Sequence, residues 1–254
     1  MPQTSYDFNM AIGFPGLIAG IGPKRIASYA NEDVPVPFGV GVIQGASANQ
    51  CRLPLKNSAT IVLDADLVAS NSVAGTVNGT ALTATVYATS HLATMTAIAA
   101  KIAAIDGVLS ATVGGTSNRT ITVLAENGET IALTSFAVTL GAGQAGVTLA
   151  HTTSDVLLGL AVHEHVEQTA SAVARYEANS AVGVMRQGTM WVTCEDAVDP
   201  SDSVYIRFAA SGGNTQLGAV RTDTDSGTAF AATGCRFMTS ASAGALVQIE
   251  VNLP

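Results

Sequence analysis

The chain has 254 residues, a hydrophobic fraction of 48%, a charged fraction of 12% and a net charge of −8. Its 11 lysine and arginine residues form no run, which argues against binding to nucleic acid or to an anionic membrane surface. Because exposed apolar patches are a solubility hazard, so few charges indicate a protein that covers much of its surface against partners.

Residues 1–35 are punctuated by glycine and proline and are interpreted as an extended arm. One short helix is expected over PKRIASY, Pro23–Tyr29, because proline favours the first turn of a helix. The apolar run AIGFPGLIAGIG is broken by Pro15, and no basic residues precede it, so it predicts neither a signal peptide nor a membrane span. We therefore expect synthesis and use in a cytoplasm, without export.

The segments that follow predict strands. FGVGVIQG and CRLP each indicate a short strand, and SVAGTV-NG-TALTATVY indicates a hairpin whose turn is Asn78-Gly79. SHLATMTAIAAKIAAIDG predicts a helix capped by Ser90 and ended by Gly107, with one apolar stripe formed by Leu92, Met95, Ile98, Ile102 and Ile105. RTITVLA-ENG-ETIALTSF indicates a second hairpin, around Asn127-Gly128.

Short strands dominate the rest of the chain. DVLLGLAVHEHV, AVGVMRQGTMWVTCE and SVYIRF each predict a strand, DPSDS at 199–203 predicts a tight turn, and LVQIEVNLP alternates with a period of two. We expect a mainly β fold: a β-barrel or sandwich-like domain of residues 36–57 plus 155–254, an inserted small α+β domain of residues 58–154, and the N-terminal arm.

The sequence HEHVE, His163 to Glu167, is the strongest candidate for chemistry. On a strand, His163, His165 and Glu167 would share one face, as ligands of a zinc ion must. The chain offers no matching motif for a fourth ligand, so a polar or interface strand face is the preferred interpretation and no metal is predicted.

Other candidate groups favour structural roles. Asp223 and Asp225 in RTDTDSG are expected in a polar turn rather than a calcium loop, because the terminal Glu of an EF-hand is absent. Asp64 and Asp66 are expected on a solvated face, and Trp191 in the barrel core. The three cysteines, Cys51, Cys194 and Cys235, are expected as reduced thiols. No catalytic constellation is present, so the protein is predicted to be neither an enzyme nor a cofactor binder.

Several segments together resemble the capsid decoration (cement) proteins of tailed bacteriophages. They are the start MPQTSYDFNMAIGFPGLIAGIGPKRIAS, VPFGVGVIQG, CRLP, LLGLAVHEHVEQ, YEANSAVGVMRQGTMWVTCEDAVDPSDSVYIRF and the ending GTAFAATGCRFMTSASAGALVQIEVNLP. The resemblance covers residues 1–57 and 155–254 and leaves the expected insert outside. The insert is similar to a module of several phage virion proteins, including tail components.

This resemblance implies a structural virion protein that is made in the bacterial host and binds the outer surface of the capsid shell. It would stabilise the shell by tying neighbouring capsid subunits together. Its expected partners are the major capsid protein and copies of itself, with which it would form a dimer or trimer. The residues expected to make these contacts are Tyr6, Phe8, Phe14, Pro15, Leu17 and Ile18. The alternatives are a tail or baseplate component, a surface-displayed glycan-binding module and, least favoured, a metal-dependent hydrolase resting on HEHVE.

Overall fold

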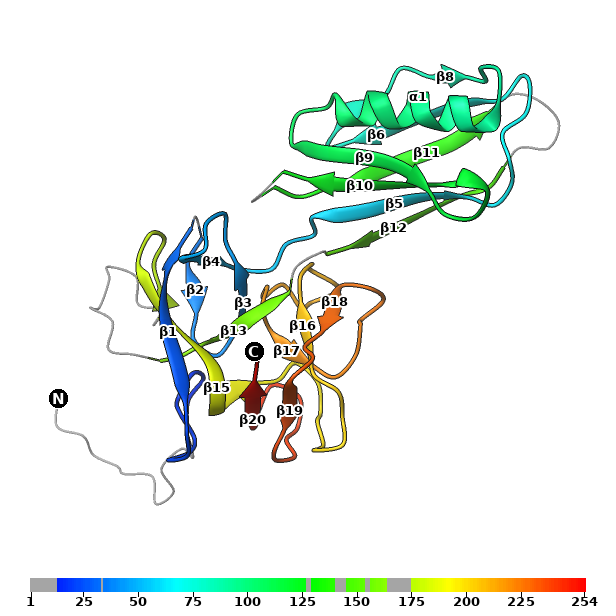
Figure 1. The fold of residues 1–254 in the computed structure, drawn as a ribbon. Helices are drawn as coiled ribbons and strands as arrows, with labels where there is room; N and C mark the ends of the chain where they lie inside the picture. The colour runs from blue at the N-terminus through cyan, green and yellow to red at the C-terminus, as the bar shows by residue number, and fades with distance from the viewer. Residues whose placement is uncertain (1–12, 33, 127–128, 140–144, 154–155, 164–174) are drawn as a thin grey trace, which may run out of the picture.

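The computed structural model describes residues 13–32, 34–126, 129–139, 145–153, 156–163 and 175–254. Within these residues the protein is mainly β, with a single α-helix, α1 (His91–Ala103). The strands fall into two groups, one drawn from both ends of the chain and one from its middle (Figure 1). The mainly β fold class expected from the sequence is confirmed.

The first group contains a small closed barrel. Strand pairings run from β1 to β4, β3, β13 and β15, and β15 pairs back with β1, which closes the ring. These strands are β1 (Arg25–Asn31), β3 (Gly41–Gln44), β4 (Gln50–Arg52), β13 (Leu157–Ala161) and β15 (Ala181–Thr193). Closure leaves these strands no free edges, which is how small barrels avoid edge-to-edge aggregation.

The long strand β15 joins this barrel to a second layer. Its first half belongs to the ring, and its second half pairs with β20 (Leu246–Asn252), which pairs with β19 (Cys235–Phe237). Two small sheets complete the group. They consist of β2 (Val36–Pro37) with β14 (Arg175–Tyr176), and of β16 (Tyr205–Arg207) between β17 (Val220–Arg221) and β18 (Ala229–Ala231).

Two hydrophobic clusters fill the first group. The barrel interior holds aliphatic residues with Phe38 and Tyr176, and the space between β15, β20 and the β16 sheet holds a second cluster. The alternation predicted for LVQIEVNLP is confirmed, since Val247, Ile249 and Val251 are fully buried. Because side chains alternate along a strand, the intervening residues point away from this core.

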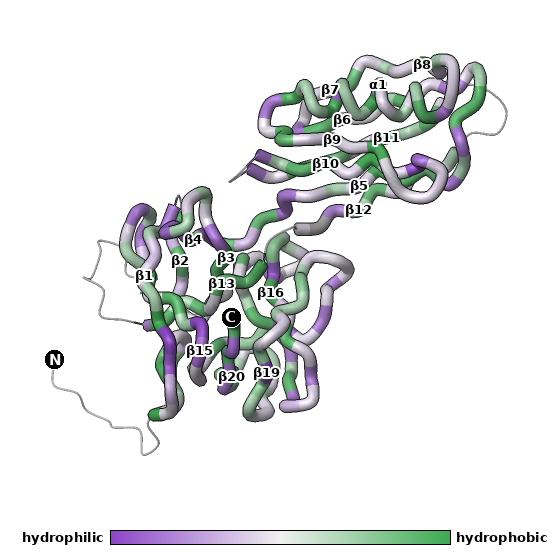
Figure 2. The backbone as a smooth tube through the Cα atoms, in the orientation of Figure 1, coloured by the Kyte–Doolittle hydropathy of each residue, from purple (hydrophilic) through white to green (hydrophobic). Residues whose placement is uncertain are grey.

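The second group consists of two sheets and the helix. One sheet is β12 (Val147–Thr152), β5 (Ser58–Leu63), β10 (Thr120–Ala125) and β9 (Val108–Gly114), and the other is β11 (Leu133–Thr139), β6 (Ser72–Val77), β7 (Thr80–Ala81) and β8 (Thr85–Val86). A short 3-10 turn spans Thr116–Asn118. Residues 59–149 supply a third hydrophobic cluster, into which α1 inserts Met95, Ile98 and Ile102. Figure 2 shows hydrophobic residues recurring along the strands of both groups.

The helix and its neighbouring hairpin follow the sequence expectation. The side chain of Ser90 accepts a hydrogen bond from the Ala93 amide, and Asn78 and Gly79 both have positive φ, as a tight hairpin turn requires. Two details differ. Leu92 is 48% exposed rather than part of the buried stripe. The helix ends at Ala103 with Ala104 as its C-cap, and Gly107 turns the chain three residues later.

Two predicted elements are wrong. The segment Pro23–Tyr29 is not helical, since residues 25–31 form β1 and pair with both β15 and β4. The strands on either side of residues 127–128 do not form a hairpin, because β10 pairs with β5 and β9 while β11 pairs with β6 in the other sheet. The turn residues themselves lie outside the described part of the chain. In both cases long-range pairing overrides a local preference.

The middle group starts and ends on paired strands. Ser58, at the start of β5, lies opposite Thr152, at the end of β12. In Figure 1 this group lies to one side of the barrel group and is joined to it by the segments before β5 and after β12. An insertion would produce this arrangement, because its two ends must lie together. The division at 58 and 154 stays a prediction.

Candidate contact surface

The described part of the arm lies along its own barrel. The Gly16 amide donates to the Trp191 carbonyl at 2.8 Å, the Trp191 amide donates to the Leu17 carbonyl at 2.8 Å, and the Ala19 amide donates to the Thr189 carbonyl at 2.9 Å. Because β20 occupies one edge of this half of β15, the arm covers the other edge. Residues 16–19 thus act as an added strand within the same chain.

The expected contact residues divide between this packing and the surface. Ile18 forms a β-bridge with Met190 and packs against the hydrophobic cluster between β15 and β20. Pro15 and Leu17 are half-buried, and Phe14 is 43% exposed. Tyr6 and Phe8 lie outside the described residues. At its described end the arm therefore packs on its own barrel and leaves Phe14 partly exposed, and contact of these residues with a partner stays a prediction.

Trp191 differs from its predicted place in the core. Its neighbours Met190 and Val192 are fully buried in the cluster, so the alternating strand turns Trp191 to the opposite face. There the indole ring lies under the arm: a Cβ added to Gly13 would come 2.9 Å from its Cδ1 atom. The half-buried Trp191 is thus part of the surface on which the arm packs.

His163, the first residue of HEHVE, stands in a row of aromatic rings. Its ring centroid is 4.5 Å from that of Phe14 and 4.4 Å from that of Phe38, and Phe38 in turn contacts Tyr176 at 5.1 Å. The His163 amide also donates to the Gly16 carbonyl at 2.8 Å. His163 therefore fixes the arm to the barrel.

The remaining members of the histidine motif, His165 and Glu167, lie outside the described residues. In the part of the chain that the structure describes, no group of three or more His, Cys, Asp or Glu side chains is arranged to hold a metal ion.

Two glycines allow the arm to approach this closely. Gly16 has a φ of +84°, and a Cβ there would lie 2.7 Å from the His163 amide nitrogen. Gly39 has a φ of +77°, and its Cβ would lie 2.9 Å from the Gly16 nitrogen. A side chain at either position would combine backbone strain with a clash against main-chain atoms.

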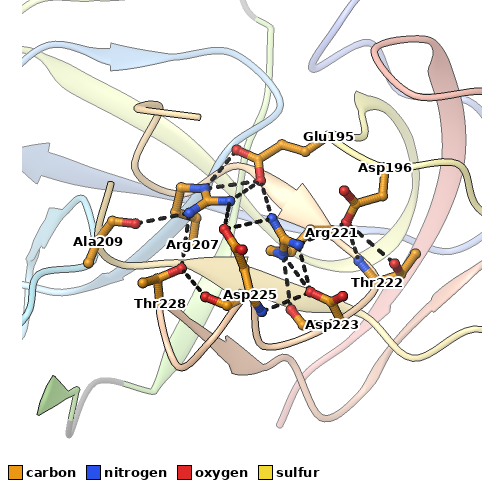
Figure 3. Close-up of polar contacts among 9 residues, drawn as sticks. All are labelled: Glu195, Asp196, Arg207, Ala209, Arg221, Thr222, Asp223, Asp225 and Thr228. Carbon is orange, nitrogen blue, oxygen red and sulfur yellow. Dashed lines mark hydrogen bonds and ion pairs between the residues drawn. The ribbon is translucent and has the colours of Figure 1, made fainter. Parts of the chain in front are cut away.

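A cluster of charges around two buried arginines lies in the barrel group of sheets (Figure 3). Arg207 is fully buried, and its Nη2 contacts both Glu195 Oε2 and Asp225 Oδ2 at 2.7 Å. Arg221 Nη1 contacts Glu195 Oε2 at 2.9 Å, and its Nη2 contacts Asp223 Oδ1 at 2.6 Å. Asp196 lies 3.3 Å from Arg221, so four carboxylates surround two guanidinium groups.

RTDTDSG forms the polar turn expected from the sequence, in which the Asp225 amide donates to Asp223 Oδ1, and the cluster adds arginine partners to its carboxylates. The hydrogen bond from Arg221 lowers the pKa of Asp223, and the hydrogen bond from Arg207 lowers the pKa of Asp225. Arginines of the adjoining strands engage both carboxylates, although the Asp223 side chain is 68% exposed and that of Asp225 is 25% exposed. The signal that sequence reading missed is an arginine in each of two short apolar strands, in YIRF and in GAVR.

The acidic pair in VLDADL also has defined partners. Asp64 Oδ1 accepts from the Gly146 amide at 2.6 Å, and Asp66 forms a 2.7 Å ion pair with Arg119 that lowers the pKa of Asp66. Both residues follow the end of β5 and brace the loops at that end of the sheet.

The cysteines are free, as expected. Burial raises the pKa of Cys51 and of Cys235 to about 12, and that of Cys194 to about 11. Since the thiolate is the reactive form, these thiols are poor nucleophiles near neutral pH.

No helix in the described part of the chain is both long and apolar enough to cross a membrane. The fold and the contact surface instead define a mainly β protein whose N-terminal arm is seated on the edge of a barrel strand.

Comparison with known proteins gives the family. The profile of the Phage_cement family, described as "Structural cement protein (E217 gp24/Pam3 gp6)", matches residues 103–252. The chain belongs to this family and is a bacteriophage capsid structural protein. The match includes residues 103–154 of the expected insert, which corrects the view that the insert lies outside the resemblance.

Among solved structures, the chain is similar to one from "The capsid of Myoviridae Phage XM1", with a TM-score of 0.48 and 12% identity over 98% of this chain and 96% of the other. No curated protein matches the chain.

Proposed function

We propose that the protein binds the outside of the phage capsid shell and stabilises it by tying neighbouring capsid subunits together. The observation that carries this proposal is the family match over residues 103–252. On this proposal the partners are the major capsid protein and further copies of the chain, the protein is located on the exterior of the virion, and its role is mechanical rather than catalytic.

The arm supplies a physical route to such cross-linking. Residues 16–19 are anchored on β15, so residues 1–12 start from a fixed point on the barrel. Phe14, at 43% exposure, presents an apolar ring at that point. Repetition over a symmetric lattice multiplies weak contacts through avidity, and binding only to the assembled shell stabilises it by mass action.

The test is co-sedimentation of the purified protein with expanded head shells that lack it, with a heat challenge of the shells. We expect the full chain to pellet with the shells and to raise their disruption temperature. The informative variant deletes residues 1–12 only, because a deletion through residue 22 would also strip the strand that covers β15. Phe14→Ala is expected to weaken binding, and Ile21→Ala, at a fully exposed apolar residue outside the pairing, is the matched control.

Each result decides between the alternatives. Binding of the full chain to shells without any gain in heat resistance would contradict the stabilising role. Binding to purified tails instead of shells would move the protein to the tail or baseplate. Retention on a glycan array, with no binding to either particle, would favour a glycan-binding module.

A further inference from the structure

An apolar cleft of about 570 Å³ opens beside β15, on the barrel group. Its walls include the exposed Val156 and the largely buried Leu157, Leu158 and Leu253, with Phe230 from β18. Among the described residues that line it, Arg186 alone carries a charged side chain. We call this hollow the Arg186 cleft.

The guanidinium group of Arg186 has unused hydrogen-bonding capacity. Its Nη2 donates to the Pro254 carbonyl, while its Nε is buried without a partner among the described atoms. A cation in an apolar wall is stabilised by a carboxylate, and the strongest such contacts are charge-assisted hydrogen bonds. The cleft therefore suits an apolar segment that carries one acidic side chain.

The N-terminal segment of this chain has that chemistry. Asp7 carries the only charged side chain among the first 23 residues, and it stands between Tyr6 and Phe8 in the stretch SYDFNM. Aromatic residues on both sides of one carboxylate match an apolar cleft that contains one guanidinium group. We propose that residues 6–8 of one copy of the protein dock in the Arg186 cleft of a second copy.

The direction of the arm favours a second copy over the same one. Arg25 pairs with Gln187, next to Arg186. Followed from there towards the N-terminus, the chain runs along β15 away from Arg186, and Gly13 lies against Trp191. Arg186 and Trp191 are five residues apart on the strand, roughly 17 Å. To return within one copy, residues 8–13 would have to reverse and span about the same distance fully extended. Exchange between copies needs no such reversal.

The experiment places a photo-cross-linker in the full-length chain. Phe8 is replaced by p-benzoylphenylalanine, equal amounts of ¹⁴N- and ¹⁵N-labelled protein are mixed, unfolded and refolded together, and the sample is irradiated. Mass spectrometry then identifies the cross-linked peptides. We expect peptides that join the arm of one isotope to segments 156–158 or 230–233 of the other. Cross-links to the cleft within one isotope only, or cross-links that avoid the cleft, would overturn the proposal.

Charge exchange tests the pairing of Asp7 with Arg186. Asp7→Lys and Arg186→Glu are each expected to weaken self-association in sedimentation velocity by about tenfold, and the double variant is expected to restore it. Arg236→Glu is the matched control, because Arg236 is an exposed arginine of the same sheet that does not line the cleft. Two single variants that associate like the natural chain would contradict the pairing.

Both assays use the isolated protein, so their outcome is independent of binding to shells. Asp7→Lys changes only the arm, which keeps the pairing testable even where Arg186→Glu impairs folding. A cross-link pattern that survives Asp7→Lys unchanged would show that the carboxylate has no part in docking.

Discussion

At the scale of single residues, Arg207 is the most consequential side chain outside the apolar clusters. It is fully buried, and each nitrogen of its guanidinium group has an acceptor, from Glu195, Asp225, Ala209 and Thr228. Removing one member of such a cluster leaves a charge buried without compensation, which is worse than losing the attraction itself. The cluster therefore holds β16, β17 and the loop after residue 221 in one arrangement.

Arg207→Met is expected to lower the free energy of unfolding by about 3–5 kcal/mol, because Glu195 and Asp225 lose their main cation. Chemical denaturation at neutral pH measures the change. The control is Arg236→Met, which breaks the exposed pair of Arg236 with Glu250 and should cost less than about 1 kcal/mol. Equal losses from the two variants would contradict a special role for the buried cluster.

This cluster also shows where sequence reading stops at the residue scale. SVYIRF and the turn at 223–225 could each be assigned locally, but the partners of Arg207 lie 12 and 18 residues away in the chain. Burial of an arginine depends on which carboxylates the fold brings to it, and a single sequence does not contain that pairing. His163 is a similar case, since its aromatic neighbours come from the arm and from the barrel.

At the scale of elements, local signals were reliable where the partner is also local. The Asn78-Gly79 hairpin, the Ser90 cap and the alternation of β20 depend on neighbours in sequence, and all three are confirmed. Two predictions were wrong, the helix at the position of β1 and the hairpin around residues 127–128, because the strands concerned pair with distant partners. PKRIASY has a proline where a helix could begin, but β1 is held by β15, more than 150 residues away.

Within one sheet of the middle group, the paired strands β6 and β11 approach closely at Gly75. A Cβ added there would come 2.5 Å from the ring of Phe136 on the paired strand β11. Gly75→Ala is therefore expected to overpack this site and to lower the free energy of unfolding by about 1–3 kcal/mol. Gly114→Ala, on β9, is the control, because no atom lies within 4 Å of its added Cβ. Urea denaturation that gives the two variants equal midpoints would contradict the close approach.

His151 links the two sheets of this group in a pH-dependent way. Its Nε2 on β12 accepts a hydrogen bond from the Leu133 amide on β11 at 3.0 Å, which only the neutral ring can do. Burial and the nearby Lys56 lower the pKa of His151. The unfolded chain therefore binds the proton more readily. The contribution of His151 to stability is complete above about pH 6.5 and is lost as the pH falls below that value.

His151→Gln keeps an acceptor for the Leu133 amide but does not titrate in this range. Between about pH 7.5 and pH 5, the natural chain is expected to lose about 1 kcal/mol more stability than this variant. Urea titrations at the two pH values measure the difference. His91 Nδ1 accepts a hydrogen bond from the Leu67 amide in both the natural chain and the variant, so the difference between their pH dependences reports on His151 alone. Identical pH dependence in both proteins would contradict the assignment.

At the scale of the whole molecule, the protein has separate hydrophobic clusters for its two groups of sheets. The cluster of the middle group draws only on residues 59–149, and the two others draw on residues before 54 and after 156 with Ile18 and Ile26 at their margin. Residues 58–154 are rich in Thr, Ala, Val and Gly, and this change of composition is the sequence basis for the expected insert. The spatial relation of the groups could not be predicted, because it depends on the short connecting segments rather than on any periodic pattern.

This separation predicts that the middle group can be removed. Ser58 and Thr152 face each other across paired strands, so residues 59–151 can be replaced by Asn-Gly, whose tight turn suits a two-residue connection. The hydrogen bonds lost at the junction include those that Ala125 and Ile131 donate to the carbonyls of Asn57 and Lys56, and the pairing of Ser58 with Leu124; water can replace these partners. We expect a soluble protein that unfolds cooperatively in calorimetry and keeps its binding to shells. The matched control carries Gly-Gly in place of Asn-Gly and should be slightly less stable. An aggregated or non-cooperative product from both chains would show that the barrel depends on the middle group for its folding.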